Sequence, residues 1–142
     1  MRYSWPRARW GMKLTVGAAG TFSVGGFMLP RSVLDARMPN ARWYASAYFF
    51  ISAPTGVGPT VSLLYTKDDF SDVVLGTLAL TAGSQATNVK RSIEPVEITQ
   101  YKDAETVLCV RLKWVLTGTN PLVVPGPATI VLTGKRRTAN DQ

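Results

Sequence analysis

Short apolar runs, separated by glycine, proline, asparagine and aspartate, follow one another along most of the chain. This spacing is typical of an all-β domain, in which short strands alternate with turn-forming residues. No window shows a sustained 3.6-residue period, although Arg31–Arg37 is compatible with one helical turn before Pro39. The pattern predicts about eight strands in a single antiparallel two-sheet sandwich, jelly-roll-like or immunoglobulin-like in its connections.

Two of the runs are specific enough to place in a sheet. Trp43–Ile51 is largely apolar on both faces, which predicts a central strand. Thr106–Leu116 alternates strictly, so one of its faces should belong to the core. That face carries Leu108, Val110, Leu112 and Trp114. Arg111 and Lys113 lie on the other face among apolar neighbours, an arrangement that would suit burial under a partner chain and also fits ordinary sandwich packing.

The remaining expected strands are shorter. Pro95 interrupts one of them and favours a sheet edge or a bulge over a central position, because proline cannot donate to the ladder. Gly118–Pro127 is rich in proline and glycine and is expected to be a loop. The shorter expected strands are Lys13–Val16, Thr21–Val24, Phe27–Leu29, Thr60–Lys67, Val73–Leu80, Val89–Thr99 and Ala128–Thr133.

The basic charge of the chain is concentrated at its two ends. The 142 residues carry a formal charge of +7, from 16 Lys and Arg against 9 Asp and Glu. Residues 1–42 hold seven of the basic residues and one acid, whereas residues 43–134 hold six basic residues and seven acids. We therefore expect a basic aromatic arm over 1–13, a nearly neutral β-sandwich domain over 14–134 and a short basic tail over 135–142.

The composition removes most catalytic machinery. There is no histidine, which excludes Ser-His-Asp and Cys-His nucleophiles and the usual histidine zinc sites. The single cysteine, Cys109, excludes an internal disulfide and has no histidine to activate it, so a small apolar role is expected. We predict a protein that is not an enzyme and that uses no cofactor and no metal.

One acidic loop leaves a question open. Asp68, Asp69 and Asp72 together are compatible with a hard cation, but they lack the spacing of a calcium loop. Aspartate is also common in turns, where it caps backbone N–H groups. The sequence does not decide between a cation site and a solvated turn.

A membrane-directed segment is not expected. Residues 14–29 are fairly apolar and follow a cationic stretch, but they contain four glycines and no typical cleavage site. No run reaches the roughly 18 apolar residues that a membrane span requires. The pattern favours a soluble protein without a membrane partner.

The most specific feature is the start of the chain, where cations alternate with aromatic residues. This combination fits an acidic protein groove, because Trp and Arg often anchor interfaces. It also fits single-stranded nucleic acid, through phosphate neutralisation and base stacking, which we regard as the less favoured partner. A third interpretation packs the aromatic residues on the domain and leaves the arginines solvated. The candidate binding residues are Arg2, Tyr3, Trp5, Arg7, Arg9, Trp10 and Lys13.

With its basic arm (MRYSWPRARW), its β-body punctuated by glycine and proline and its basic tail (GKRRTANDQ), the chain resembles small β-sandwich virion proteins. These are coat, decoration or head-fibre proteins of viruses and bacteriophages, and the resemblance covers the overall plan rather than a motif. It implies a virion location, self-association into a homo-oligomer, and capsid or other virion subunits as partners. Four cations in the arm are few for packaging a genome, which favours decoration or attachment over a genome-enclosing coat.

A different class of function also fits the pattern. A carbohydrate-binding or receptor-binding β-sandwich module of an adhesin or tail fibre would use exposed Trp and Tyr side chains as sugar platforms. Burial of Trp43 and Trp114 would argue against this alternative.

Overall fold

The computed structural model describes the backbone of residues 2–10, 20–55, 60–79, 88–116 and 122–136. Within these ranges the chain forms eight strands and two short helices. The strands are β1 (Arg2–Trp10), β2 (Gly20–Pro30), β3 (Ala41–Thr55), β4 (Thr60–Thr66), β5 (Asp72–Ala79), β6 (Asn88–Glu97), β7 (Val107–Leu116) and β8 (Leu122–Arg136). The helices are α1 (Arg31–Arg37), between β2 and β3, and α2 (Thr99–Ala104), between β6 and β7.

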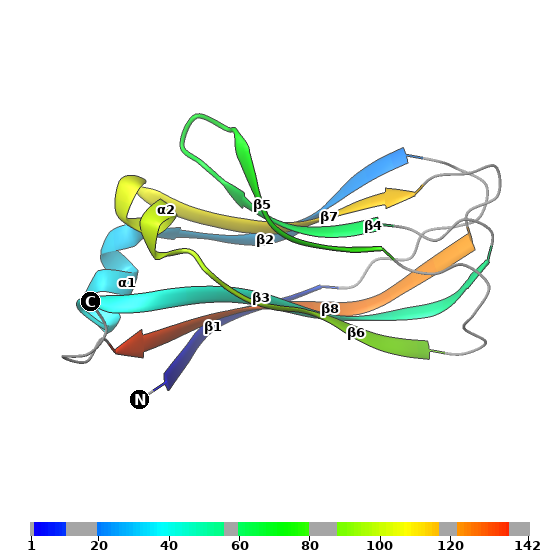
Figure 1. The fold of residues 1–142 in the computed structure, drawn as a ribbon, viewed down its shortest axis with the longest axis horizontal. Coiled ribbons are helices and arrows are strands. Elements are labelled where there is room, and N and C mark those ends of the chain that lie inside the picture. The colour runs from blue at the N-terminus through cyan, green and yellow to red at the C-terminus, as the bar shows by residue number, and fades with distance from the viewer. Residues whose placement is uncertain (1, 11–19, 56–59, 80–87, 117–121, 137–142) are drawn as a thin grey trace.

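The strands stack as two four-stranded antiparallel layers (Figure 1). One sheet has the order β1-β8-β3-β6 and the other β2-β7-β4-β5. The pairs are nested, since β1 pairs with β8, β2 with β7, β3 with β6, and β4 with β5. This nesting confirms the expected all-β sandwich and gives it a jelly-roll-like connectivity, in which the chain crosses between sheets at most connections.

The core lies between the two sheets. The predicted inner face of β7 is confirmed, because Leu108, Val110, Leu112 and Trp114 are all buried. Trp43 on β3 and Trp114 are fully enclosed, and Trp114 meets Phe49 edge-on with ring centroids 5.4 Å apart. Such pairs add about 0.5–1.5 kcal/mol beyond the area they bury.

The sheet positions of two expected strands are also confirmed. β3 lies between β8 and β6, and β6 lies at the edge of the same sheet. Pro95 falls where the register between β3 and β6 shifts, next to Val96, which pairs with Ala45. An edge strand tolerates proline there because its outward N–H groups need no partner.

The structure corrects the expected strands at β2. The two short strands Thr21–Val24 and Phe27–Leu29 are one strand, with a register shift against β7 between Val24 and Phe27. A bulge is the reason, because Gly25 and Gly26 fit one extra residue into the ladder. A Cβ on Gly26 would lie 1.7 Å from the carbonyl oxygen of Val110, so only glycine fits there.

Two further boundaries differ from the expectation. β8 begins at Leu122, inside the expected loop, and pairs with β3 on one side there. β1 pairs with β8 from Ala128 onward, which leaves Pro125 on an edge-like stretch that tolerates proline. Thr99 begins α2 rather than ending a strand, and its hydroxyl accepts a hydrogen bond from the backbone N–H of Trp43 at 2.9 Å. The expected strand Lys13–Val16 lies outside the described residues.

Both helices lie at one end of the sandwich (Figure 1), where an ion-pair cluster joins them. The Lys102 ammonium on α2 is buried and lies 2.7 Å from carboxylate oxygens of Asp35 on α1 and Asp103. The cluster fixes α1 against α2 over the end of the core. In the parts of the chain that the structure describes, no helix combines the length and the apolar character needed to cross a membrane.

Candidate functional site

The predicted basic arm is a strand of the sandwich. Its residues Arg2–Trp10 form β1, the edge strand that pairs with β8. The register shifts between Ser4 and Arg7, around Trp5 and Pro6, which is the kind of edge position where proline is found. The segment is therefore extended, as expected, but its backbone is bound to the sheet. Lys13 lies outside the described residues.

The register of β1 separates its cationic positions from most of its aromatic ones. On β8, the alternate residues Ala128, Ile130 and Gly134 are buried against the core. They pair with Trp10, Ala8 and Tyr3. The positions between them on β8 pair with Arg9, Arg7 and Arg2 and lie on the outer face of the sheet. By register, the arginine positions of β1 therefore share the outer face.

A row of three basic residues crosses this outer face. Lys135 on β8 is exposed and pairs directly with Arg2 on β1 and with Arg42 on β3. Like charges directly opposite one another on neighbouring strands repel. The two registers therefore bring three basic positions together at one place on the sheet.

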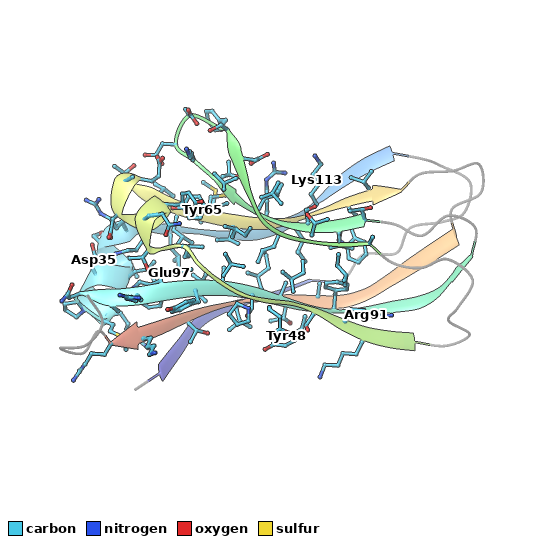
Figure 2. The ribbon with its side chains drawn as sticks, in the orientation of Figure 1. Asp35, Tyr48, Tyr65, Arg91, Glu97 and Lys113 are labelled. Carbon is cyan, nitrogen blue, oxygen red and sulfur yellow. The ribbon has the colours of Figure 1, made fainter. Side chains whose placement is uncertain are left out.

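Other side chains extend the outer face of the β1-β8-β3-β6 sheet. Lys90 on β6 is exposed, and Tyr48 on β3 projects away from the sandwich (Figure 2). The aromatic cluster of β3 is thus divided, because Trp43 and Phe49 enter the core while Tyr44 and Tyr48 occupy this face. A shallow hollow of about 260 Å³ is lined by Tyr44, Pro95, Thr133 and Lys135. We call this outer face the basic face; its basic positions are Arg2, Arg7, Arg9, Arg42, Lys90 and Lys135, and register also places Glu97 on it.

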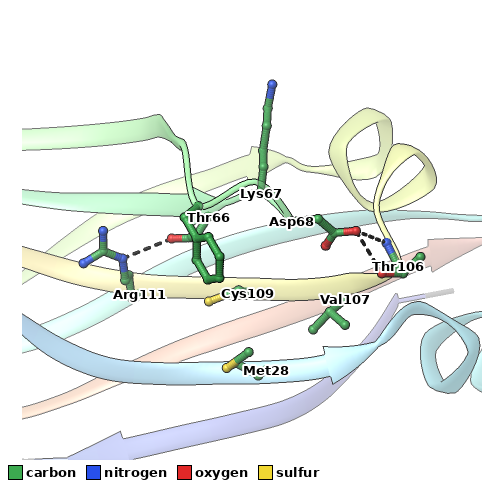
Figure 3. Close-up of a pocket in the computed structure, with 9 residues that line it drawn as sticks. Met28, Thr66, Lys67, Asp68, Thr106, Val107, Cys109 and Arg111 are labelled. Atoms are coloured by element: carbon green, nitrogen blue, oxygen red, sulfur yellow. Dashed lines mark hydrogen bonds between the residues drawn. The ribbon is translucent and has the colours of Figure 1, made fainter.

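A second surface lies on the outer side of the β2-β7-β4-β5 sheet, beside the β4–β5 hairpin (Figure 3). It is an open hollow of about 720 Å³ that we call the hairpin hollow. Exposed apolar side chains gather around it: Met28 on β2 is 72% exposed and Phe70 in the hairpin loop is 88% exposed. Val74 on β5, beyond the loop, is 59% exposed. The residues lining the hollow are Met28, Thr66, Lys67, Asp68, Phe70, Thr106, Val107, Cys109 and Arg111.

The hairpin loop holds Phe70 in an unusual backbone conformation. The Phe70 N–H donates to the Lys67 carbonyl at 2.9 Å, and the Lys67 N–H donates to the Ser71 carbonyl at 2.8 Å. These bonds close a three-residue loop whose last position, Phe70, has a φ of 68°. Glycine is favoured at such a position, because a side chain there costs roughly 1–2 kcal/mol. The strained residue is also an exposed aromatic one.

The acidic loop uses its carboxylates for internal hydrogen bonds. Asp68 accepts from the backbone N–H and the hydroxyl of Thr106, at 3.0 and 2.8 Å. Asp69 accepts from the N–H and the hydroxyl of Ser71, at 3.0 and 2.6 Å. Asp72 pairs with Arg111 at 2.6 Å, so the three carboxylates serve separate partners. Among the described residues, no group of three acidic, histidine or cysteine side chains is arranged to hold a metal ion.

Arg111 and Cys109 lie side by side on the outer face of β7. Besides Asp72, Arg111 donates from Nε to the Thr66 hydroxyl at 3.0 Å, so its charge is neutralised within its own chain. Burial raises the pKa of the Cys109 thiol, which favours the unreactive protonated form. Cys109 therefore lacks the environment of a nucleophilic thiolate. Lys113, from the same face of β7, projects away from the sandwich (Figure 2).

We expect the hairpin loop to make folding sensitive to acid. Hydrogen bonds from Thr106 hold the pKa of the Asp68 carboxyl below its usual range. A lowered folded-state pKa stabilises the protein above the unfolded-state pKa, and this contribution is lost as the pH falls through the folded value. Stability should therefore decrease below about pH 4, and Asp68→Asn should make that decrease shallower.

Thermal unfolding midpoints measured from neutral to acidic pH test this expectation. Glu94→Gln, which removes an exposed carboxylate from β6, is the matched control, and its unfolding midpoint should fall with decreasing pH as steeply as that of the wild-type protein. If the midpoint of Asp68→Asn falls with decreasing pH as steeply as that of the wild-type protein, Asp68 is not the source of the acid sensitivity.

Comparison with known proteins finds distantly similar structures and no family. No protein-family model matches the chain, and no curated protein matches it. A structure of infectious bursal disease virus, Gx strain, is similar with a TM-score of 0.44 and 10% identity, over 98% of this chain and 37% of that one. Dimeric latent PorU from Porphyromonas gingivalis is similar with a TM-score of 0.48 and 13% identity, over 98% of this chain and 13% of that one. The chain therefore spans a small part of both.

A third similar structure has a chain closer to this one in length. The Tobacco streak virus coat protein dimer gives a TM-score of 0.35 and 14% identity, over 93% of this chain and 88% of that one. These matches describe what the sandwich is similar to, and they assign the chain to no family.

Proposed function

We propose that this protein is a non-enzymatic structural component of a virion, of the decoration or assembly kind, which docks on an acidic neighbouring subunit and self-associates. The contact surface is the basic face. The observation that carries this proposal is the row formed by Arg2, Lys135 and Arg42 across three neighbouring strands. Such a row concentrates basic positions at one place on the sheet, which favours an anionic partner.

The architecture supports a role that depends on a rigid surface. Jelly-roll sandwiches occur in viral capsid proteins and also in lectins and cupins, so the fold alone does not select one of these. Here the basic residues of the arm lie on a strand, which fixes their backbone positions in the sheet. A backbone that is already held in place loses little entropy on binding, which suits repeated contacts in a shell.

The described side chains also support a role without turnover. The sequence contains no histidine, and Cys109 is held as a thiol by burial. The loop carboxylates Asp68, Asp69 and Asp72 are engaged by Thr106, Ser71 and Arg111. A general acid or base needs a proton-transfer group that is accessible and poised near the working pH.

The carbohydrate-binding alternative needs exposed Trp and Tyr side chains on which a sugar can stack. Trp43 and Trp114 are both buried in the core, so neither can present a flat ring to a sugar. Tyr48 remains exposed on the basic face. We infer that this face contacts a protein neighbour rather than a glycan, since its dominant feature is charge.

Charge-removing substitutions on the basic face test the proposal better than deletion of the arm. Deleting residues 1–13 would also remove β1 and leave β8 with an unpaired edge. We expect Arg2→Ser with Lys135→Ser to weaken self-association about tenfold, because two charges leave the contact while the fold is retained. Lys113→Ser with Arg37→Ser removes the same charge from positions outside the basic face and the hairpin hollow and is the matched control.

Light scattering and native mass spectrometry over a range of concentration and salt give the measurement. The proposal expects self-association that weakens with rising salt and that is reduced in the Arg2/Lys135 variant only. Equal association in both double variants would contradict docking through the basic face. Steep, salt-dependent retention of oligonucleotides, lost in the same variant, would instead identify nucleic acid as the partner.

A further inference from the structure

We propose that the hairpin hollow, with Phe70 at its rim, binds the basic face of a second copy of this chain. The inference rests on the proposed function and deepens it, because it identifies the acidic neighbour on which the basic face docks. It follows from the apolar surface, the loop geometry and the charges of the β2-β7-β4-β5 sheet.

The apolar surface around the hollow is unusually open to solvent. Three of the five large exposed apolar side chains in the described part of the protein are Met28, Phe70 and Val74, and all three lie on this side of the molecule. The other two, Val33 and Tyr48, lie on α1 and on the basic face. Grouped exposed apolar residues with a polar rim are typical of protein–protein contact sites.

The loop geometry fixes Phe70 in position. Two backbone hydrogen bonds close the loop, and the side chains of Asp68 and Asp69 tie it to Thr106 and Ser71. The Asp68 N–H also donates to the Glu105 carboxylate at 3.0 Å. Because these bonds hold the aromatic ring in place before binding, little conformational entropy remains to be lost on docking.

The charges beside Phe70 complement the basic face. Asp68 and Asp69 are exposed in the loop itself, and Glu105 lies next to them through its bond to Asp68. Lys67 is the cation of the same loop, and Arg111 is neutralised by Asp72. The rim of the hollow is therefore acidic on balance, while the basic face presents the row of Arg2, Lys135 and Arg42.

The two surfaces lie on opposite outer faces of the sandwich. In Figure 2, Lys113 projects from the sheet that carries the hollow, and Tyr48 projects from the basic face on the other side. One copy cannot bring both of its own surfaces together. A two-fold contact joins the same patch of both copies, so it cannot join two surfaces that lie on opposite faces. The contact is therefore head-to-tail, which produces rings or open chains of subunits rather than a closed dimer.

Substitution of Phe70 by glycine gives the first test. Glycine removes the exposed ring and adopts the φ of 68° without strain, so the variant should unfold at the same temperature as the wild-type protein or higher. We expect its self-association, measured by sedimentation velocity, to be at least about tenfold weaker. Val33→Ser, which removes an exposed apolar side chain from α1, is the control and should associate normally.

A charge exchange between copies gives the second test. Asp69→Lys makes the rim of the hollow basic, and Lys135→Glu makes the basic face less basic, so each variant alone should associate weakly. An equimolar mixture should regain association, because each copy then offers the other a complementary pair of surfaces. Thermal unfolding of both variants confirms that the loop and the sheet are intact before mixing.

The outcomes separate this inference from the function on which it rests. Self-association that is unchanged in Phe70→Gly and that shows no recovery on mixing overturns the hollow as the docking site. Sensitivity to Arg2→Ser with Lys135→Ser would then still support the proposed function through another acidic surface. A closed dimer that does not grow with concentration overturns the head-to-tail contact, and a monomer at every concentration overturns self-association as well.

Discussion

Replacing Gly26 with alanine should lower the free energy of unfolding by about 3 kcal/mol or more, the largest single-residue effect we expect. An added Cβ would lie 1.7 Å from the Val110 carbonyl oxygen and 2.8 Å from its carbon. Both are backbone atoms of β7, which is a central strand of its sheet. Relief of the clash would require β2 to move away from β7 and to lose ladder hydrogen bonds on both sides of the bulge.

Gly76→Ala is the matched control for this prediction. A Cβ there would lie 2.7 Å from the Cγ2 atom of Ile93, which is a side-chain atom and not part of the backbone. Ile93 lies on the edge strand β6 and can shift, so we expect a cost of about 1 kcal/mol. Urea denaturation of the three proteins gives the comparison. A Gly26→Ala protein as stable as Gly76→Ala would show that the bulge tolerates a side chain.

The parts of the fold that the sequence predicts are those set by local alternation. β7 shows a strict period of two, so its core face could be read residue by residue from Leu108 to Trp114. β3 is apolar on both faces, and the structure places it between two strands. Pro95 marked β6 as an edge strand, since a missing N–H is tolerated at a sheet edge.

The first strand shows why alternation alone does not predict whether a segment pairs with the sheet. Arg2–Trp10 alternates cationic and apolar residues as an edge strand does, but Pro6 and the net charge also fit a free arm. The deciding fact is its pairing with β8, which comes from the opposite end of the chain. Such a pairing closes a very long loop and leaves no local signal in either segment.

The two candidate surfaces are still less visible in the sequence. Arg2, Arg42 and Lys135 are far apart along the chain, and only the registers of β1 and β3 against β8 bring them into one row. Phe70 carried a weak signal, because an aromatic residue in an otherwise polar turn has no core to enter. Its positive φ depends on the hydrogen bonds of the loop, which the composition of the turn does not specify.

The ion-pair cluster between the helices gives the second large prediction. The combined change Asp35→Asn and Asp103→Asn should lower the free energy of unfolding by about 3–5 kcal/mol, because it leaves a buried ammonium without a counter-charge. The Lys102 side chain is 5% exposed, and its two partner oxygens both lie at 2.7 Å. The amide groups that replace the carboxylates provide dipoles in place of charges, so the buried ammonium loses its counter-charge.

Lys102→Met should cost much less, although it removes the residue at the centre of the same cluster. Methionine has a similar length and needs no partner, and the two carboxylates it leaves are about half exposed and can be solvated. Combining Lys102→Met with the two asparagine substitutions should restore most of the lost stability, because no buried charge then remains. A triple variant as unstable as the double variant would mean that Asp35 and Asp103 position α1 and α2 through contacts other than the ion pairs. Chemical denaturation of the three variants and the wild-type protein distinguishes these results through the coupling between the sites.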